Sequence, residues 1–139
     1  MSEKSLQENI VAHLSSIELC LQHHYRMPAL ILIYSGIDIF SSLALPIEKE
    51  DGTRQDFINW TEKYITGVEN FGCDAIDLYA ARCGVVHANT ATSSLSRKNQ
   101  AKIILYAWGN RTPESLQTLV DTVGIKCCRN SYRSIGDSL

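Results

Sequence analysis

The segment PALILIYSGIDIFSSLALP, residues 28–46, decides how the rest of the chain folds. Between its two prolines it is apolar on most sides of a helix, and such a helix usually lies at the centre of a protein. Pro28 fits the first turn of this helix, and Pro46 ends it after about Leu45. Polar and small residues interrupt the run, namely Ser35, Gly36, Asp38, Ser41 and Ser42. We therefore interpret it as a buried helix and expect no membrane span.

Three further helices are predicted around this segment. Apolar residues spaced by three and four indicate an amphipathic helix over residues 4–25; they are Leu6, Ile10, Leu14, Ile17 and Leu21. Thr53 is expected to cap a third helix. Asp74 is expected to cap a fourth, which runs to about Asn89.

The remainder of the chain predicts a smaller C-terminal addition. Residues 90–100 indicate a polar loop. Residues 102–108, KIILYAW, are short, β-branched and aromatic, so they favour a strand over the alternative of a helix. A helix is expected from about Pro113 to Gly124, then a second short strand over residues 125–128. The fold class is thus mainly α, in one domain over residues 1–139. Its four-helix bundle spans residues 4–92, and the addition, with one or two short strands, spans residues 99–139.

Net charge and cysteine content indicate which partners the protein can bind and in which cellular compartment it is expected. The chain has 139 residues and a net charge of −2, so only a local cluster of positive groups would attract a polyanion. Five cysteines form no CxxC pair, which argues against a disulfide framework or a zinc ribbon. The N-terminus lacks the basic-then-apolar order of a signal peptide. We expect a cytoplasmic protein.

Two strongly polar residues, Arg82 and His87, interrupt the apolar run of the fourth helix. Five positions apart, they diverge by about 140° around an ideal helix. Both sides of the helix are apolar enough to be buried, so a second copy of the chain is the simplest cover for one of them. A twofold axis there would gather two arginines and two histidines, an arrangement that favours a bound phosphate.

Arg82-Cys-Gly-Val-Val-His87 resembles the Arg-x(4–6)-His signature of the HEPN superfamily, and the order of helices over residues 4–92 agrees. The resemblance implies a helical bundle that forms a homodimer through the signature helix. It also implies a metal-independent endoribonuclease, as in toxin–antitoxin and phage-defence systems, with RNA as substrate, an antitoxin protein as a possible partner and no cofactor. The residue after the arginine, often Asn, Asp or His in active members, is Cys83 here.

The implied reaction is attack of a ribose 2′-hydroxyl on the neighbouring phosphate, which leaves a 2′,3′-cyclic phosphate. His87 is expected to transfer protons, because its reference pKa lies near neutrality. Arg82 is expected to stabilise the charge that develops on the phosphate. Asn89, Thr90 and Arg97 are expected to bind the substrate beside these two residues.

Other interpretations of the same residues stay open. Arg82 is also expected to pair with a carboxylate, either Asp38 or Asp77, because buried charges are usually paired. His87 also fits a histidine favoured by the carbonyl end of a helix. Cys20 and His24 have a metal-like spacing, but no second pair of ligands is evident, so no metal is expected. The alternative function is a non-catalytic HEPN-like dimeric module that binds a nucleotide, RNA or a protein partner.

Overall fold

The computed structural model describes residues 2–49, 51–68, 72–106, 108 and 113–123. Among these residues it is mainly helical and contains no strand, so the predicted mainly α class is confirmed. The helices are α1 (Glu3–Gln22), α2 (Arg26–Leu43), α3 (Arg54–Thr61), α4 (Ala75–Ala88), α5 (Ser94–Arg97) and α6 (Pro113–Val123). A π-helical turn, η1 (Glu62–Thr66), continues α3.

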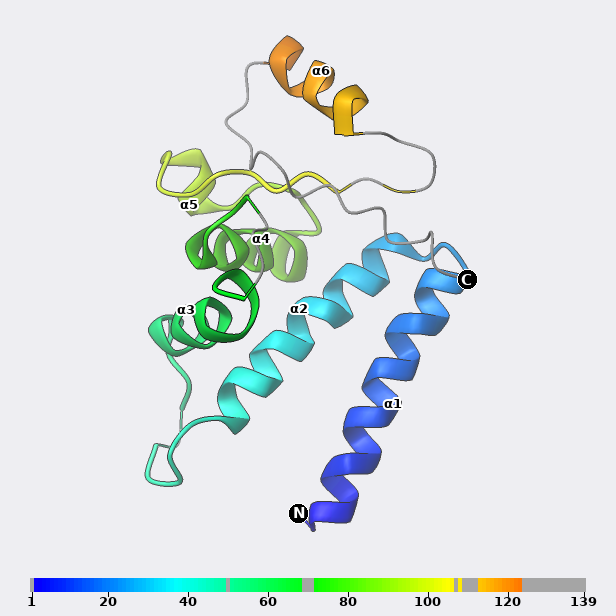
Figure 1. Ribbon diagram of the computed structural model, residues 1–139, viewed down its shortest axis with the longest axis vertical. Coiled ribbons are helices and arrows are strands. Elements are labelled where there is room, and N and C mark those ends of the chain that lie inside the picture. The colour runs from blue at the N-terminus through cyan, green and yellow to red at the C-terminus, as the bar shows by residue number, and fades with distance from the viewer. Residues whose placement is uncertain (1, 50, 69–71, 107, 109–112, 124–139) are drawn as a thin grey trace.

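The helices α1 and α2 lie side by side as a long hairpin (Figure 1). The turn between them depends on His24, whose left-handed backbone (φ 59°) lets Tyr25 N donate to Cys20 O at 2.8 Å. His24 therefore ends α1 three residues before the predicted boundary.

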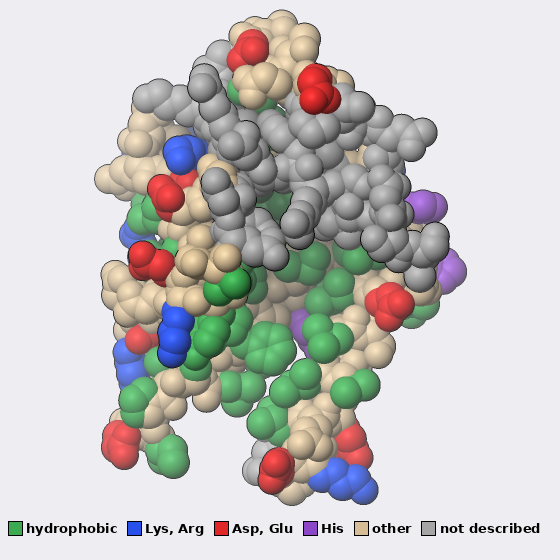
Figure 2. Space-filling model, viewed as in Figure 1, with side chains coloured by type: hydrophobic (Ala, Val, Ile, Leu, Met, Phe, Trp, Pro, Cys, Tyr) green, Lys and Arg blue, Asp and Glu red, His purple; other side chains and the backbone are tan. Residues whose placement is uncertain are grey.

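His13 lies on the side of α1 that faces α2, where the two helices approach closely. His13 Nε2 donates to Leu32 O at 2.9 Å, and a Cβ on Gly36 would lie 3.0 Å from that nitrogen. This close approach turns Leu14, predicted to be on the buried side, outward to 52% exposure. Hydrophobic side chains are visible on this lower part of the molecule in Figure 2, and the exposed large ones of the hairpin include Val11, Leu14, Leu19, Ile39 and Leu43.

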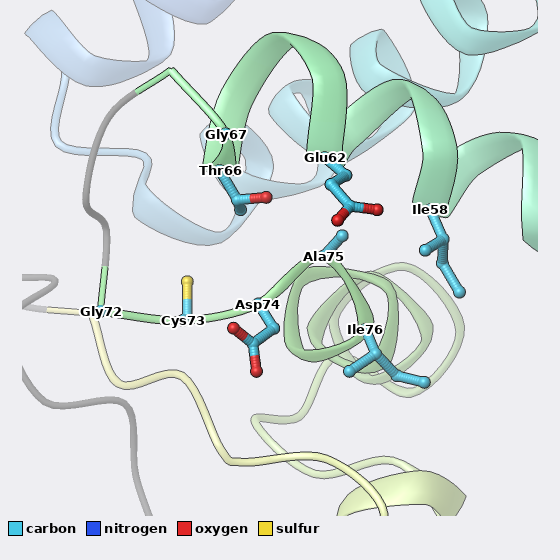
Figure 3. Close-up of a pocket in the computed structure, with 9 residues that line it drawn as sticks. All are labelled: Ile58, Glu62, Thr66, Gly67, Gly72, Cys73, Asp74, Ala75 and Ile76. Carbon is cyan, nitrogen blue, oxygen red and sulfur yellow. The ribbon is translucent and has the colours of Figure 1, made fainter.

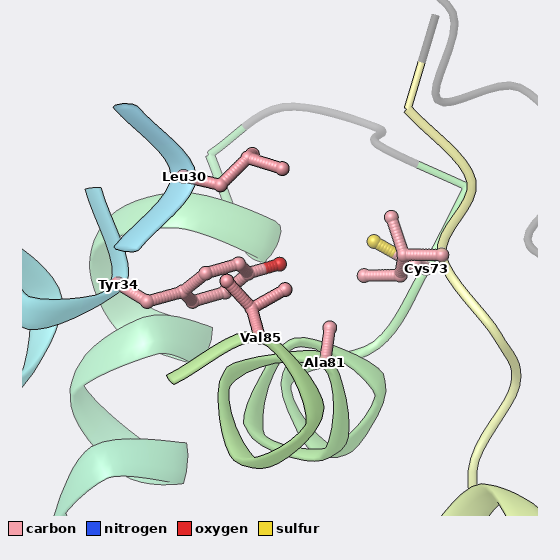
Figure 4. Close-up of a cluster of buried hydrophobic side chains, with 6 residues drawn as sticks. Leu30, Tyr34, Cys73, Ala81 and Val85 are labelled. Carbon is pink, nitrogen blue, oxygen red and sulfur yellow. The ribbon is translucent and has the colours of Figure 1, made fainter. Parts of the chain in front are cut away.

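Helix α2 is central, as its apolar sequence predicted. It packs against α1, α3 and α4. Leu30 and Tyr34 of α2 meet Ala81 and Val85 of α4 in the core, where the Tyr34 ring lies beside Val85 (Figure 4). Val85 is 1% exposed, so α4 is fixed against α2 by close packing.

The third and fourth helices begin at the predicted caps. Thr53 and Asp56 form a reciprocal capping box at the start of α3, and Asp74 and Asp77 form one at the start of α4. The π turn after α3 ends at Gly67, where a Cβ would clash with the backbone carbonyl oxygen of Glu62. Phe57 meets Tyr79 edge to face, with ring centroids 5.4 Å apart, and holds α3 against α4.

The predicted loop over residues 90–100 contains a short helix, α5. Ser93 and Ser96 cap it reciprocally, a serine pattern that sequence reasoning treated only as polar. The predicted helix near the C-terminus is confirmed as α6.

The strand predicted over residues 102–108 is wrong for the residues described there. The described residues form a single β-bridge position at Ile103 and no extended ladder, and the segment packs on helices. Ile104 enters the core cluster, and the Tyr106 hydroxyl lies 2.5 Å from that of Tyr34. The strand predicted over residues 125–128 lies outside the described residues.

Among the described residues, α2 is the one helix long and apolar enough to cross a membrane by length and composition. The central helix of a folded helical protein has the same length and composition. The packing of α2 against α1, α3 and α4 is that of such a central helix.

Candidate functional site

Arg82 is held by a carboxylate of the central helix. Its Nε donates to Asp38 Oδ2 at 2.8 Å, Nη2 forms an ion pair with the same oxygen at 2.8 Å, and the two side chains are 22% and 33% exposed. Burial lowers the pKa of Arg82, but the hydrogen bond and charge of Asp38 outweigh it, so this pKa lies above its usual value. The predicted Asp38 pairing is confirmed. The other candidate, Asp77, instead binds the backbone N–H of Lys102.

The same guanidinium reaches His87 within one chain. Arg82 Nη1 lies 3.0 Å from His87 Nε2, so the predicted divergence around the helix does not keep the two groups apart. The long arginine side chain spans the angle, and His87 stands in the last turn of α4. A guanidinium has no acceptor, so Nη1 must donate to a neutral Nε2. Asp38, Arg82 and His87 thus form a line of hydrogen bonds from the C-terminal third of α2 to solvent.

A second arginine approaches the neighbouring turn of α4. The Arg54 guanidinium lies over the Tyr79 ring, 5.2 Å from its centroid. Burial raises the pKa of Tyr79, and the adjacent Cys83 raises it further, whereas Arg82 and Arg54 act in the opposite direction. Cys83, in the position after the arginine, therefore interacts with Tyr79 and lies 4.0 Å from Arg82 Nη1.

The predicted substrate-binding residues do not all lie together. Asn89 ends α4 in a left-handed conformation (φ 51°), which places its exposed side chain two positions after His87. Thr90 N donates to Gly84 O at 3.1 Å, and its hydroxyl donates to Thr92 O. Arg97 is exposed at the end of α5, and no contact among the described residues joins it to Arg82.

Gly84 allows the chain to fold back over α4 after the site. A Cβ at this position would lie 2.8 Å from the carbonyl oxygens of both Thr90 and Thr92. These are backbone atoms, so a larger residue would displace the loop that follows His87. Gly84, two residues after Arg82, therefore positions the C-terminal edge of the site.

A cavity of about 240 Å³ adjoins Arg82 on the side of Asp38. Ser41, Ser42 and Thr53 line it as well, and sequence reasoning assigned them no part in the site. The sequence did contain a pattern that could have predicted this polar cavity wall. Asp38, Ser41 and Ser42 are spaced by three and four residues, so they share one face of an otherwise apolar helix.

A larger cavity, of about 590 Å³, lies at the other end of α4. Its lining includes Glu62 and Asp74, whose carboxylates point in different directions (Figure 3). Arg82 is eight residues beyond Asp74, about 12 Å along the helix axis. The two cavities are therefore separate sites.

No group of three or more His, Cys, Asp or Glu side chains in the described part of the chain is placed to hold a metal ion. His24 belongs to the left-handed turn after α1, so it does not share a helical face with Cys20.

Comparisons of the chain with protein-family models, curated proteins and solved structures find no match. Function is therefore argued from the geometry of the site.

Proposed function

We propose that this protein is a metal-independent endoribonuclease whose active site is formed by Arg82 and His87. The observation that carries the proposal is the 3.0 Å contact between Arg82 Nη1 and His87 Nε2, braced from behind by Asp38. A positive group and a neutral imidazole side by side are what phosphate transfer to a ribose hydroxyl requires. This arrangement accords with the resemblance to HEPN domains.

In the proposed reaction, an RNA phosphate accepts the Nη1 hydrogen bond that His87 accepts in the free protein. His87 Nε2 is thereby released to take the proton of the 2′-hydroxyl. The O2′–P bond forms and the P–O5′ bond breaks, giving a 2′,3′-cyclic phosphate. The imidazolium then returns its proton to the leaving 5′-oxygen. Asp38 keeps the Arg82 guanidinium in place throughout, as a positioning residue.

Asn89 and Thr90 follow His87 directly and are proposed to contact the RNA backbone. Asn89 is the better placed, because its side chain is exposed and makes no hydrogen bond with another described residue. Arg97 would contact a more distant phosphate from α5.

A homodimer through α4 is part of the proposal. Cys83 and His87 lie one turn apart on the stripe that ends α4, and each keeps part of its surface exposed, whereas Tyr79, one turn before Cys83, is covered by Phe57 and Arg54 of α3. A second copy packed on this stripe would bring two Arg82–His87 pairs near each other. A toxin or phage-defence role, an antitoxin partner and a cytoplasmic location complete the hypothesis.

Incubation of the protein with RNA in excess chelator tests the proposal. We expect cleavage with 2′,3′-cyclic phosphate ends, and a loss of about 10²–10⁴-fold in rate for His87→Ala. His23→Ala is the matched control, because His23 is also exposed and near a helix end but lies on α1. Arg82→Lys keeps the charge and loses the planar fork, so it should also lose activity. Equal cleavage by wild type and His87→Ala would refute the proposal.

A non-catalytic module that binds a nucleotide, RNA or a protein partner is the second candidate. It is favoured by the Arg82–Asp38 pair, which already satisfies part of the guanidinium, and by Cys83 after the arginine. Nucleotide or RNA binding that Arg82→Lys weakens, with no strand cleavage in any variant, would select this alternative.

A further inference from the structure

The cavity beside Arg82 is built by three helices. Asp38, Ser41 and Ser42 come from α2, Thr53, Asp56 and Phe57 from the start of α3, and Arg82 from α4. The three residues of α2 are the polar face of a helix that is otherwise apolar. Arg82 lies 44 residues after Asp38 and 29 residues after Thr53, so tertiary packing and not local structure forms this cavity.

The charges around the cavity are already paired. Asp38 binds Arg82, and the Asp56 carboxylate accepts two hydrogen bonds from Lys49 Nζ, at 2.7 and 2.6 Å. Two ion pairs leave the cavity polar but close to neutral. A neutral group with hydrogen-bonding edges suits such a space better than a free anion or cation.

Acceptors and hydroxyls remain available inside it. The hydrogen bond and the ion pair from Arg82 both reach Asp38 Oδ2, and no hydrogen bond from a described residue reaches Asp38 Oδ1. The exposed Ser42 hydroxyl makes none with the described residues either, while Ser41 donates to Asp38 O and keeps its lone pairs. Phe57 adds an apolar wall.

We propose that this cavity binds a nucleobase of the RNA next to the cleaved bond, and selects one with an exocyclic amino group. The inference rests on the proposed function, because Arg82 belongs both to the proposed active site with His87 and to the wall of the cavity. Its Nη1 faces His87 and the scissile phosphate, and its other edge forms a wall of the cavity. A cytosine amino group donates to Asp38 Oδ1, where the uracil carbonyl would place two acceptors face to face.

One hydrogen bond to a charged acceptor sets the size of the preference. At about 1.5 kcal/mol, the lower end for a charged acceptor, it corresponds to roughly a 10-fold choice of cytidine over uridine. Ser42 strengthens the choice by offering a second polar contact to the same base.

The test is a short oligouridine that carries one cytidine, cleaved in excess chelator and mapped by mass spectrometry. We expect cleavage to concentrate at a bond beside the cytidine. Asp38→Asn presents an amide N–H to the base, so the ratio of cytidine to uridine cleavage should fall towards or below one even if the rate falls for both. Ser42→Leu fills the cavity and should also reduce this ratio. Ser16→Leu, on the exposed side of α1, is the matched control and should leave it unchanged.

The outcomes separate the two proposals. Cleavage that needs His87 but shows equal rates at cytidine and uridine, with no effect of Ser42→Leu, overturns the base site and leaves the nuclease standing. If the wild type neither cleaves nor binds the oligonucleotide, the nuclease proposal and the base-site proposal are both refuted. As a readout that needs no chemistry, His87→Ala should bind an oligomer containing 2′-deoxycytidine several-fold more tightly than the 2′-deoxyuridine oligomer.

Discussion

Replacing Asp77 by alanine should destabilise the fold more than any exposed acidic substitution. Asp77 is 1% exposed at the start of α4. Its Oδ1 accepts from Lys102 N at 2.7 Å, and its Oδ2 accepts from Asp74 N at 3.0 Å. The carboxylate therefore both caps α4 and fastens to it the segment that returns from α5.

The expected loss in the free energy of unfolding follows from the two backbone N–H groups that lose their acceptor in Asp77→Ala. Hydrogen bonds to a charged group contribute about 1.5–3 kcal/mol each. The Asp74 N–H stands at a helix end that water can reach, so it recovers part of its loss. The Lys102 ammonium, 3.8 Å away and 45% exposed, adds little. We expect Asp77→Ala to lower the free energy of unfolding by about 2–4 kcal/mol.

Thermal and urea unfolding followed by circular dichroism measure this loss. For a chain of this size it corresponds to a fall in Tm of roughly 10 °C. Asp77→Asn keeps the shape and one acceptor, so it should lose about half as much free energy. Glu8→Ala, which breaks only an exposed 4.0 Å pair with Lys4, is the control and should change stability by less than about 0.5 kcal/mol. A loss below about 1 kcal/mol for Asp77→Ala would refute the anchoring role.

Three other substitutions test the packing around the site. Gly84→Ala should lower the free energy of unfolding in a urea titration despite a helix-propensity gain of about 1 kcal/mol, because its Cβ would lie 2.8 Å from two backbone oxygens. Gly36→Ala is the control: its Cβ would lie 3.0 Å from the end of the His13 side chain, so its effect should be closer to neutral. Tyr106→Phe removes the hydroxyl that pairs with a phenol on α2, and should cost about 1 kcal/mol by thermal unfolding; no change would mean that this pair does not hold the segment. Hydrogen bonds from Lys49 and from the capping threonine lower the pKa of Asp56 from 3.8 to about 2. The carboxylate therefore stabilises the fold above pH 4, and this contribution disappears as the pH falls to 2, so wild type should lose its advantage over Asp56→Asn in that window of an acid titration.

Local patterns in the sequence were sufficient for most helices. Thr53 and Asp74 were recognised as caps because capping depends only on residues within one turn. Three errors share a different cause. Residues 102–106 have strand-like composition but pack on helices, α5 depends on serines that cap one another, and His13 rather than Leu14 meets α2. Each of these was decided by a neighbour that local composition does not specify.

The candidate site divides in the same way. Helical spacing predicted that Arg82 and His87 lie in the last turns of one helix, and apolar composition predicted that Asp38 lies in the central helix. Helix packing determines that Asp38, not Asp77, binds the Arg82 guanidinium, and that Arg82 reaches His87 in its own chain. Only packing, too, placed the start of α3 opposite Ser41 and Ser42 to leave a cavity. Periodicity fixes the direction of a side chain on its own helix, whereas a partner 44 residues away is fixed by how three helices pack together.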